Sequence, residues 1–282
     1  MGRCLCLNAA VGDNRRVSSV FFVPSSGRPA MSGVRRSLAM IVVVAFVPGS
    51  TTGDEPSKPL ADVVSPTVQI RNGNKTGSGT VVHSVRDDTL ILTAAHVVRD
   101  SGDGLKVEIH RHNLNPNSRT AVLTQGGGWP RLVPATVEVI DIAADVALVR
   151  VRGMAKLPAI CEFDPKSPEP AKGNVLTSVG IDRSLHLTRW KSRIEGAAML
   201  EVVPGAGESR FTVTTKYPEH GRSGGGLFRA DGTVVGVCVG QLSIRPGTPK
   251  VGVFASVGSI RKVFQEYDRT IAKSRSPLPD GR

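Results

Sequence analysis

The decapeptide EHGRSGGGLF (residues 219–228) places one serine, Ser223, among four glycines. Glycine clusters commonly form turns, because the missing side chain permits positive φ. A tight loop of this kind can also present a serine hydroxyl as a nucleophile. A serine is a poor nucleophile until an imidazole takes its proton, and the imidazole in turn needs a carboxylate to orient it. The decapeptide therefore predicts a catalytic serine only if a suitable histidine and acid occur elsewhere in the chain.

Composition is that of a globular protein with many short strands. The 282 residues are 40% hydrophobic, 21% charged and 4% aromatic, and 31 glycines and 19 prolines supply frequent turns. The formal charge is +12, and it falls to about +7 beyond residue 49. The basic residues there are scattered and are not interleaved with aromatics, so we expect a solvated surface and no nucleic-acid partner.

The N-terminal segment has the layout of a secretory signal peptide. Residues 31–57 read MSGVRRSLAMIVVVAFVPGSTTGDEPS, with two arginines before the apolar run 38–47. Such a run is too short to span a bilayer. We predict that residues 1–49 are a leader, that Met31 is the true start, and that the mature protein is secreted or periplasmic without a stable membrane span.

Beyond a linker at 50–63, strand-like runs rich in β-branched residues recur between turn signals. Strands alternating with helices are absent from the pattern, which argues against a doubly wound sheet. We predict an all-β body with an N-terminal barrel at 64–156, an inter-barrel linker at 157–173 and a C-terminal barrel at 174–256. Apolar residues at helical spacing predict a C-terminal helix at 257–274, followed by a tail at 275–282. The eleven strand-like runs are 67–70, 78–85, 89–95, 106–110, 135–140, 145–151, 174–180, 185–196, 210–215, 233–240 and 250–256.

A histidine and an acid stand at the ends of two of these runs. His96 ends the apolar run LILTAAHVV, and Asp145 begins the run DVALVRV. Taken singly, a histidine in such a place is more often a hydrogen-bonded core residue, and such an acid is more often a strand-end cap. Asp141, four residues earlier, is a rival for the same role.

Together, the motifs TAAH, D-x-A-L and G-x-S-G-G, in that order, resemble the trypsin-like (chymotrypsin-fold) serine proteases. The nearer likeness is to the bacterial HtrA/Deg-type branch, without its PDZ domain, and it covers residues 65–270. The resemblance implies two six-stranded antiparallel β-barrels. It also implies Ser223 as nucleophile, His96 as general base, Asp145 as its orienting acid, and an oxyanion hole from the N–H groups of Gly221 and Ser223. The D-x-A-L pattern favours Asp145 over Asp141.

The same loop departs from the family pattern near its serine. Arg222 precedes the serine where a small polar or acidic residue is usual, which predicts a cation near the cleft. Tyr217 falls near the base of the specificity pocket and is no aspartate, so we expect no preference for Lys or Arg at the cut site. His220 is expected to line the cleft. These three residues are the predicted substrate pocket, which we expect to accept small or medium apolar side chains.

The sequence predicts no cofactor and no metal site. Beyond the leader, Cys161 and Cys238 form no zinc pattern; export would permit a disulfide between them, and a buried thiol is the alternative. His110 and His112 share one face of a predicted strand and could bind a metal; the alternative, which we favour, is that they are exposed, have no acidic partner and serve no site. G-x-S-x-G also fits the nucleophile elbow of α/β-hydrolases, but no histidine follows Ser223 as that fold requires.

The sequence therefore predicts a serine endopeptidase that acts on polypeptide substrates through an acyl-enzyme. The alternative is a catalytically silent relative that binds peptides or partner proteins in the same cleft.

Overall fold

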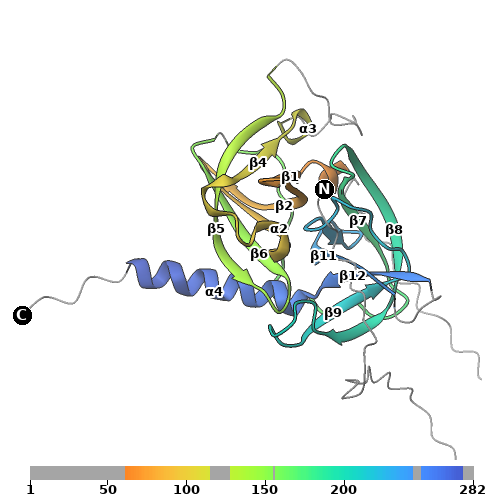
Figure 1. Ribbon diagram of the computed structural model, residues 1–282. Coiled ribbons are helices and arrows are strands. Elements are labelled where there is room, and N and C mark those ends of the chain that lie inside the picture. The colour runs from red at the N-terminus through yellow and green to blue at the C-terminus, as the bar shows by residue number, and fades with distance from the viewer. Residues whose placement is uncertain (1–60, 115–127, 155, 244–248, 276–282) are drawn as a thin grey trace, which may run out of the picture. The chain divides into compact units, whose positions relative to one another are not determined.

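Twelve strands form two closed barrels in the structure, a computed structural model that describes residues 61–114, 128–154, 156–243 and 249–275. The first barrel has the strand order β1-β2-β3-β6-β5-β4, and the second has the order β10-β11-β12-β9-β8-β7 (Figure 1). All neighbouring strands whose pairing is resolved run antiparallel. The predicted fold class, two six-stranded antiparallel barrels with a C-terminal helix, is confirmed.

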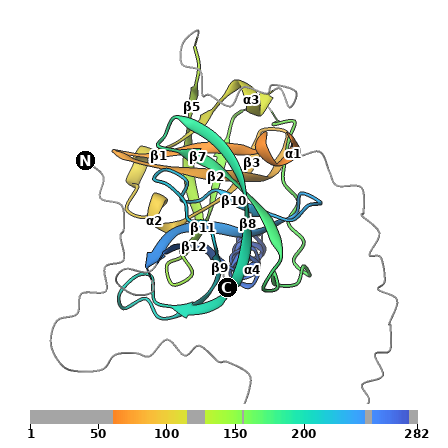
Figure 2. The same ribbon diagram turned by 90° about the vertical axis from the view of Figure 1, so that its right-hand side faces the viewer.

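The strands of the first barrel are β1 (Thr67–Asn72), β2 (Lys75–Val85), β3 (Asp88–Thr93), β4 (Leu105–Ile109), β5 (Arg131–Asp141) and β6 (Val146–Arg152). Those of the second are β7 (Val175–Asp182), β8 (His186–Leu200), β9 (Ser209–Thr214), β10 (Gly226–Phe228), β11 (Val234–Ser243) and β12 (Lys250–Ala255). The helices are α1 (Ala61–Val64), α2 (Ala95–Val98), α3 (Arg111–Leu114) and α4 (Val257–Arg275). Figure 2 shows the same elements from the side.

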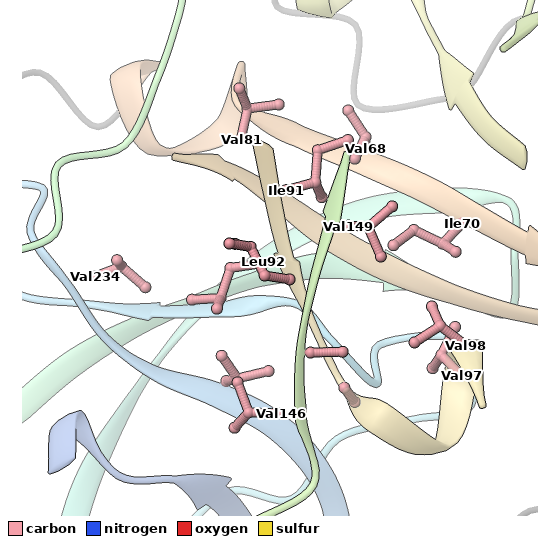
Figure 3. Packing of buried hydrophobic residues seen from close by; sticks show 14 of the residues in the cluster. Val68, Ile70, Val81, Ile91, Leu92, Val97, Val98, Val146, Val149 and Val234 are labelled. Atoms are coloured by element: carbon pink, nitrogen blue, oxygen red, sulfur yellow. The ribbon is translucent and has the colours of Figure 1, made fainter. Parts of the chain in front are cut away.

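Branched aliphatic side chains fill the first barrel. Figure 3 shows side chains from different strands meeting in its interior, among them Val68, Ile91 and Val149, none of which is exposed to solvent. Burying each such side chain contributes about 1.5–3 kcal/mol. Val234 on β11 belongs to the same cluster, so the apolar core continues from the first barrel into the second.

Helix α4 packs against β5 and β6 of the first barrel (Figure 1). Ile260 and Val263 are buried in the core, as their helical spacing predicts. The hydroxyl of Ser256 accepts a hydrogen bond from the N–H of Ser259 (3.2 Å), which caps the first turn. The carboxylate of Glu169, from the segment between the barrels, accepts a second one from Gly258 N (2.8 Å). The C-terminal helix is therefore joined to both the first barrel and the inter-barrel segment.

Each of the eleven predicted runs overlaps an observed strand. The sequence missed β10, whose three residues show no alternation; they form a strand because β7 and β11 lie on either side of them. The predicted leader and the first eleven residues of the predicted linker at 50–63 lie outside the described residues. No helix in the described ranges is long and apolar enough to cross a membrane. Cys161 and Cys238 are both buried, and they pack in different hydrophobic clusters.

The expectation that His110 and His112 are exposed is wrong. Both side chains are about 4% exposed, and their rings stack with centroids 5.5 Å apart. An acidic neighbour is also present: Glu108 Oε2 lies 3.4 Å from His110 Nε2, and the same carboxylate pairs with Arg71 on β1. Burial and, to a smaller extent, the charge of Arg71 together lower the pKa of His110 to about 4. Burial likewise lowers the pKa of His112 to about 4, against the hydrogen bond from its ring to Thr67 O.

These two histidines predict a loss of stability in mild acid. In the unfolded chain each takes up a proton near pH 6.5, whereas in the folded protein each stays neutral until about pH 4. Their contribution is therefore complete above about pH 6.5 and is lost as the pH falls towards 4. For one histidine the loss between pH 7 and pH 5 is about 2 kcal/mol.

The variant His110→Phe keeps the stacked ring and removes one titrating group. We expect urea unfolding to show wild type losing about 2 kcal/mol more than His110→Phe between pH 7 and pH 5. Equal losses in the two proteins would contradict the assigned burial of a neutral imidazole.

Candidate active site

His96 and Asp145 are joined by two hydrogen bonds. The ring Nδ1 of His96 lies 2.6 Å from Asp145 Oδ2, and the backbone N–H of His96 donates to Oδ1 (2.8 Å). The His96 side chain is 20% exposed and that of Asp145 is 3% exposed. One carboxylate therefore fixes both the backbone and the ring of His96, and it leaves Nε2 as the ring atom available to a substrate or a nucleophile.

Asp145 reaches His96 because the chain turns sharply just before β6. Its φ is 54°, in the left-handed region that non-glycine residues occupy at a cost of about 1–3 kcal/mol. Asp141 Oδ1 accepts a hydrogen bond from Ala144 N (2.9 Å) and thereby closes the turn. The two acids thus have different places: Asp145 contacts the histidine, as we predicted, and Asp141 shapes the loop that carries Asp145.

Ser223 lies in the connection between β9 and β10, beside the first barrel. Its carbonyl accepts a hydrogen bond from Ser78 N on β2 (2.7 Å). Gly77 has no room for a side chain, since a Cβ there would lie 2.6 Å from Val97 Cγ2 and 2.9 Å from Ser223 O. The backbone of Ser223 is therefore packed close to Val97, the residue that follows His96.

The hydroxyl of Ser223 donates to Val239 O on β11 (3.2 Å). Among the residues that the structure describes, no hydrogen bond joins this hydroxyl to His96. The structure thus brings the three predicted residues to one region and shows the His96–Asp145 contact directly. The serine side chain is in a rotamer that faces the neighbouring strand.

The carbonyl groups of the three residues before Ser223 are held in place. Each accepts a hydrogen bond from a neighbouring segment or from the loop itself. The three bonds are Arg183 N to His220 O (2.6 Å), Ser78 Oγ to Gly221 O (2.8 Å) and Gly225 N to Arg222 O (2.8 Å).

These bonds determine where two N–H groups point. The peptide unit is planar and trans, so the N–H of Gly221 faces away from the His220 carbonyl, and the N–H of Ser223 faces away from the Arg222 carbonyl. Within the described part of the chain, neither N–H has an acceptor. The φ of Gly221 is 89°, a conformation that favours glycine. An oxyanion hole needs two such N–H donors without an acceptor, and these two flank Arg222.

Gly224 marks the closest approach of the loop to the first barrel. Its φ is 88°, and a Cβ there would collide with the carbonyl oxygen of Ser78 and the hydroxyl of Thr93. Its own N–H donates to Cys238 O (2.7 Å). Glycine is therefore required here both by backbone conformation and by space.

A pocket with apolar walls opens beside His96 and Asp145. Besides His96 and Asp145, its lining comes from the end of β8, the β8–β9 connection, β11 and β12, and it includes Leu200, Val202, Val239, Leu242 and Val253. Aliphatic side chains thus predominate in the wall next to the His96–Asp145 pair.

The predicted substrate-pocket residues do not line this pocket. Tyr217 is 46% exposed, and the ammonium of Lys250 lies 5.8 Å from the centre of its ring. His220 is exposed. The expectation for Arg222 needs correction: its side chain is fully buried and pairs with Asp182, because the loop turns it inwards, under the serine. It places no cation in the cleft.

Two residues of the site escaped the sequence analysis. Ser78 bonds to the serine loop through its N–H and its hydroxyl, and its only sequence signal is its place in the run GSG before the histidine. Asp182 ends β7 and holds Arg222. Nothing in the sequence links Asp182 to a residue forty positions later.

A family model identifies the class of protein to which the chain belongs. The family model described as "Trypsin-like peptidase domain" matches residues 77–237, more than half of the chain. The chain belongs to the trypsin-like peptidase family. In this trypsin-like peptidase the match begins just before Ser78 and ends within β11. It therefore includes His96, Asp145, Asp182 and the serine loop, but not Cys238, Val239 or the residues beyond them.

Individual relatives agree with the family and the fold. The trypsin-like peptidase is 28% identical over 204 residues to "Putative protease Do-like 14" of Arabidopsis thaliana, an alignment that covers 71% of this chain and 43% of the relative. The match thus spans less than half the length of that protein. Two structures of Rv3671c from M. tuberculosis, both described as an inactive form, share the fold. A serine-to-alanine mutant gives a TM-score of 0.55 at 21% sequence identity, and the alignment covers 84% of this chain and 100% of that chain. The second structure gives a TM-score of 0.54 at 23% identity, and the alignment covers 73% of this chain and 91% of that chain.

The close approach at Gly224 gives a testable prediction for this trypsin-like peptidase. Gly207, in the connection between β8 and β9, has the same φ of 88°, but a Cβ added there would have no atom within 4 Å. Gly207→Ala therefore measures the cost of the backbone conformation alone, about 1 kcal/mol. We expect Gly224→Ala to lower the free energy of unfolding by at least about 2 kcal/mol more, because an unfavourable contact is added.

The measurement is urea unfolding of both variants beside wild type. If Gly224→Ala and Gly207→Ala are destabilised equally, the close packing of the loop against Ser78 and Thr93 is contradicted.

Proposed function

We propose that the protein is a serine endopeptidase that cleaves polypeptides through an acyl-enzyme. Ser223 Oγ attacks the scissile carbonyl while His96 Nε2 takes its proton. The same imidazole then protonates the leaving amine, and a water that it activates hydrolyses the acyl-enzyme. Asp145 holds the tautomer of His96 and stabilises the imidazolium form.

The observation that carries this proposal is the two-point contact between Asp145 and His96. The carboxylate takes Nδ1 at 2.6 Å, which leaves Nε2 for the serine. The unengaged N–H groups of Gly221 and Ser223 supply the second requirement, stabilisation of the tetrahedral oxyanion. Each such donor contributes about 3 kcal/mol to transition-state binding.

In this mechanism the serine side chain changes rotamer before attack. Its hydroxyl leaves Val239 O, where the hydrogen bond measures 3.2 Å, and turns towards His96. The acceptor that the hydroxyl leaves and the imidazole that it approaches belong to one region, because Val239 and His96 line the same pocket. Catalytic hydrogen bonds are commonly loose in the free enzyme and tighten with substrate bound.

We further propose that the substrate presents an apolar side chain to the pocket beside His96. The walls contributed by Leu200, Val202 and Leu242 offer no charge to bind a basic or acidic group. This supports the expected preference for apolar side chains, although the walls differ from the residues that the sequence suggested.

One observation favours the second candidate, a catalytically silent peptide-binding protein. The Ser223 hydroxyl is bonded to a backbone carbonyl rather than to the imidazole. A protein in which this rotamer persisted would bind peptides in the cleft without cleaving them.

Covalent labelling with a fluorophosphonate probe distinguishes the two candidates. We expect the wild-type protein to be labelled at Ser223, because the probe reports an activated serine. Ser223→Ala should not be labelled. A folded wild-type protein that resists the probe would favour the silent peptide-binding protein.

The two acids of the β5–β6 loop provide a matched control. Asp145→Asn should lower the labelling rate by about 10⁴-fold, because an amide holds the imidazole in the wrong tautomer. Asp141→Asn keeps an acceptor for Ala144 N and should change the rate by less than about threefold. Comparable losses in both variants would contradict the role given to Asp145.

A further inference from the structure

Arg222, the residue before the nucleophile, is the largest fully buried side chain in the described structure. A charged guanidinium in such a place is costly unless each of its nitrogens has a partner. The side chain leaves the loop beneath Ser223 and crosses to the β7–β8 hairpin. Its stem packs on Gly180, where an added Cβ would lie 2.8 Å from Arg222 Cγ. The second barrel thus contains a fitted site for this one side chain.

All three nitrogens of the guanidinium are bound there. Nε and Nη2 donate to the two oxygens of Asp182, each at 2.8 Å, which is a bidentate pair. Nη1 donates to Ser178 Oγ (3.1 Å). Nη2 also contacts the hydroxyl and the carbonyl of Thr188. The ring of Trp190 stacks over the guanidinium, with its centre 4.8 Å from Cζ.

The position of Arg222 in the chain gives this pair its importance. The N–H groups proposed for the oxyanion hole belong to Gly221 and Ser223, the residues on either side. The backbone of Arg222 is also engaged, through Arg222 N to Glu219 O (3.3 Å) and Gly225 N to Arg222 O (2.8 Å). A side chain fixed at its far end, on a residue fixed at its backbone, leaves the two flanking peptide units little freedom to rotate.

We propose that Arg222 is a positioning residue whose buried pair with Asp182 holds the two oxyanion-hole N–H groups in their productive orientation. This inference rests on the proposed function. It differs from the general mechanism because it assigns the stability of the loop to an internal ion pair between this arginine and the end of β7. Arg222 touches no substrate; it acts through Gly221 and Ser223.

A matched control exists in the first barrel. Arg150 on β6 is 7% exposed, contacts the carboxylates of Asp88 (3.4 Å) and Glu138 (3.5 Å), and lies over the ring of Tyr267. It is also a nearly buried arginine with acidic and aromatic partners, but it lies outside the serine loop. Arg150→Met therefore reports the general cost of losing such a residue.

The experiment measures fluorophosphonate labelling of wild type, Arg222→Met and Arg150→Met, each corrected for its folded fraction. We expect kinact of Arg222→Met to fall by about 100-fold, the loss associated with one oxyanion-hole donor, while KI changes less than about threefold. Arg150→Met should keep the wild-type kinact. Asp182→Asn, which preserves volume, should likewise have a lower kinact with a nearly unchanged KI. It is the variant to measure if Arg222→Met does not fold.

A double variant separates positioning from stability. Arg222→Met combined with Asp182→Leu removes both charges of the pair, and replacing a largely buried ion pair by apolar side chains commonly restores stability. We expect its Tm to recover while kinact stays low, because no specific bonds orient the loop. Recovery of kinact together with Tm would overturn the proposal.

Hydrogen exchange gives a readout that does not depend on activity. The hydrogen-bonded amides of Arg222, Gly224 and Gly225 should exchange at least about tenfold faster in Arg222→Met than in Arg150→Met, because the loop loses its anchor. If wild type is labelled and Arg222→Met has an unchanged kinact, the positioning role fails and the proposed function stands. If wild type is not labelled, the proposed function fails, and equal exchange in the two variants then overturns the positioning role as well.

Discussion

The contact between Ser78 and the serine loop is the constraint on which the rest of the site depends. Ser78 belongs to the first barrel, yet its N–H bonds to Ser223 O and its hydroxyl links Gly221 O to Ile181 N in the second barrel. His96 and Asp145 are carried by the first barrel and Ser223 by the second. The proposed chemistry therefore requires the barrels to be held in register, and Ser78 bonds to both sides of the junction. Gly224, with no space for a side chain against Ser78 O, makes the approach possible.

Two kinds of interaction hold the serine loop at the junction of the barrels. Apolar burial is continuous across the barrels, which supplies affinity between them but no particular orientation of a peptide group. Orientation comes from directional bonds: the Ser78 hydroxyl to Gly221, the Arg183 N–H to His220, and the bidentate pair of Arg222 with Asp182. The ordered loop is thus held from both barrels. Its serine hydroxyl donates to Val239 O, and the proposed mechanism requires it to turn from there to the imidazole.

The sequence predicted what local patterns encode. Alternating β-branched runs predicted the strands, and a helical stripe at Ile260 and Val263 predicted α4, because these signals depend on near neighbours in the chain. The order of three motifs predicted which of Asp141 and Asp145 meets His96. The placement of Arg222 was wrong, and its partner Asp182 went unnoticed, because whether a long charged side chain turns inwards depends on a tertiary site forty residues away. The same holds for β10, which forms a strand only between two others.

The most direct test of the central claim is a crystal structure of the protein with a peptide boronate bound. The account predicts a bond from boron to Ser223 Oγ, one boronate oxygen about 2.7–3.1 Å from the N atoms of both Gly221 and Ser223, and His96 Nε2 in contact with a second oxygen. Arg222 should still be paired with Asp182 beneath the adduct. The account would be contradicted if no boronate oxygen accepted a hydrogen bond from either N–H. It would also be contradicted if the Ser223 hydroxyl stayed hydrogen-bonded to Val239 O and formed no bond to boron.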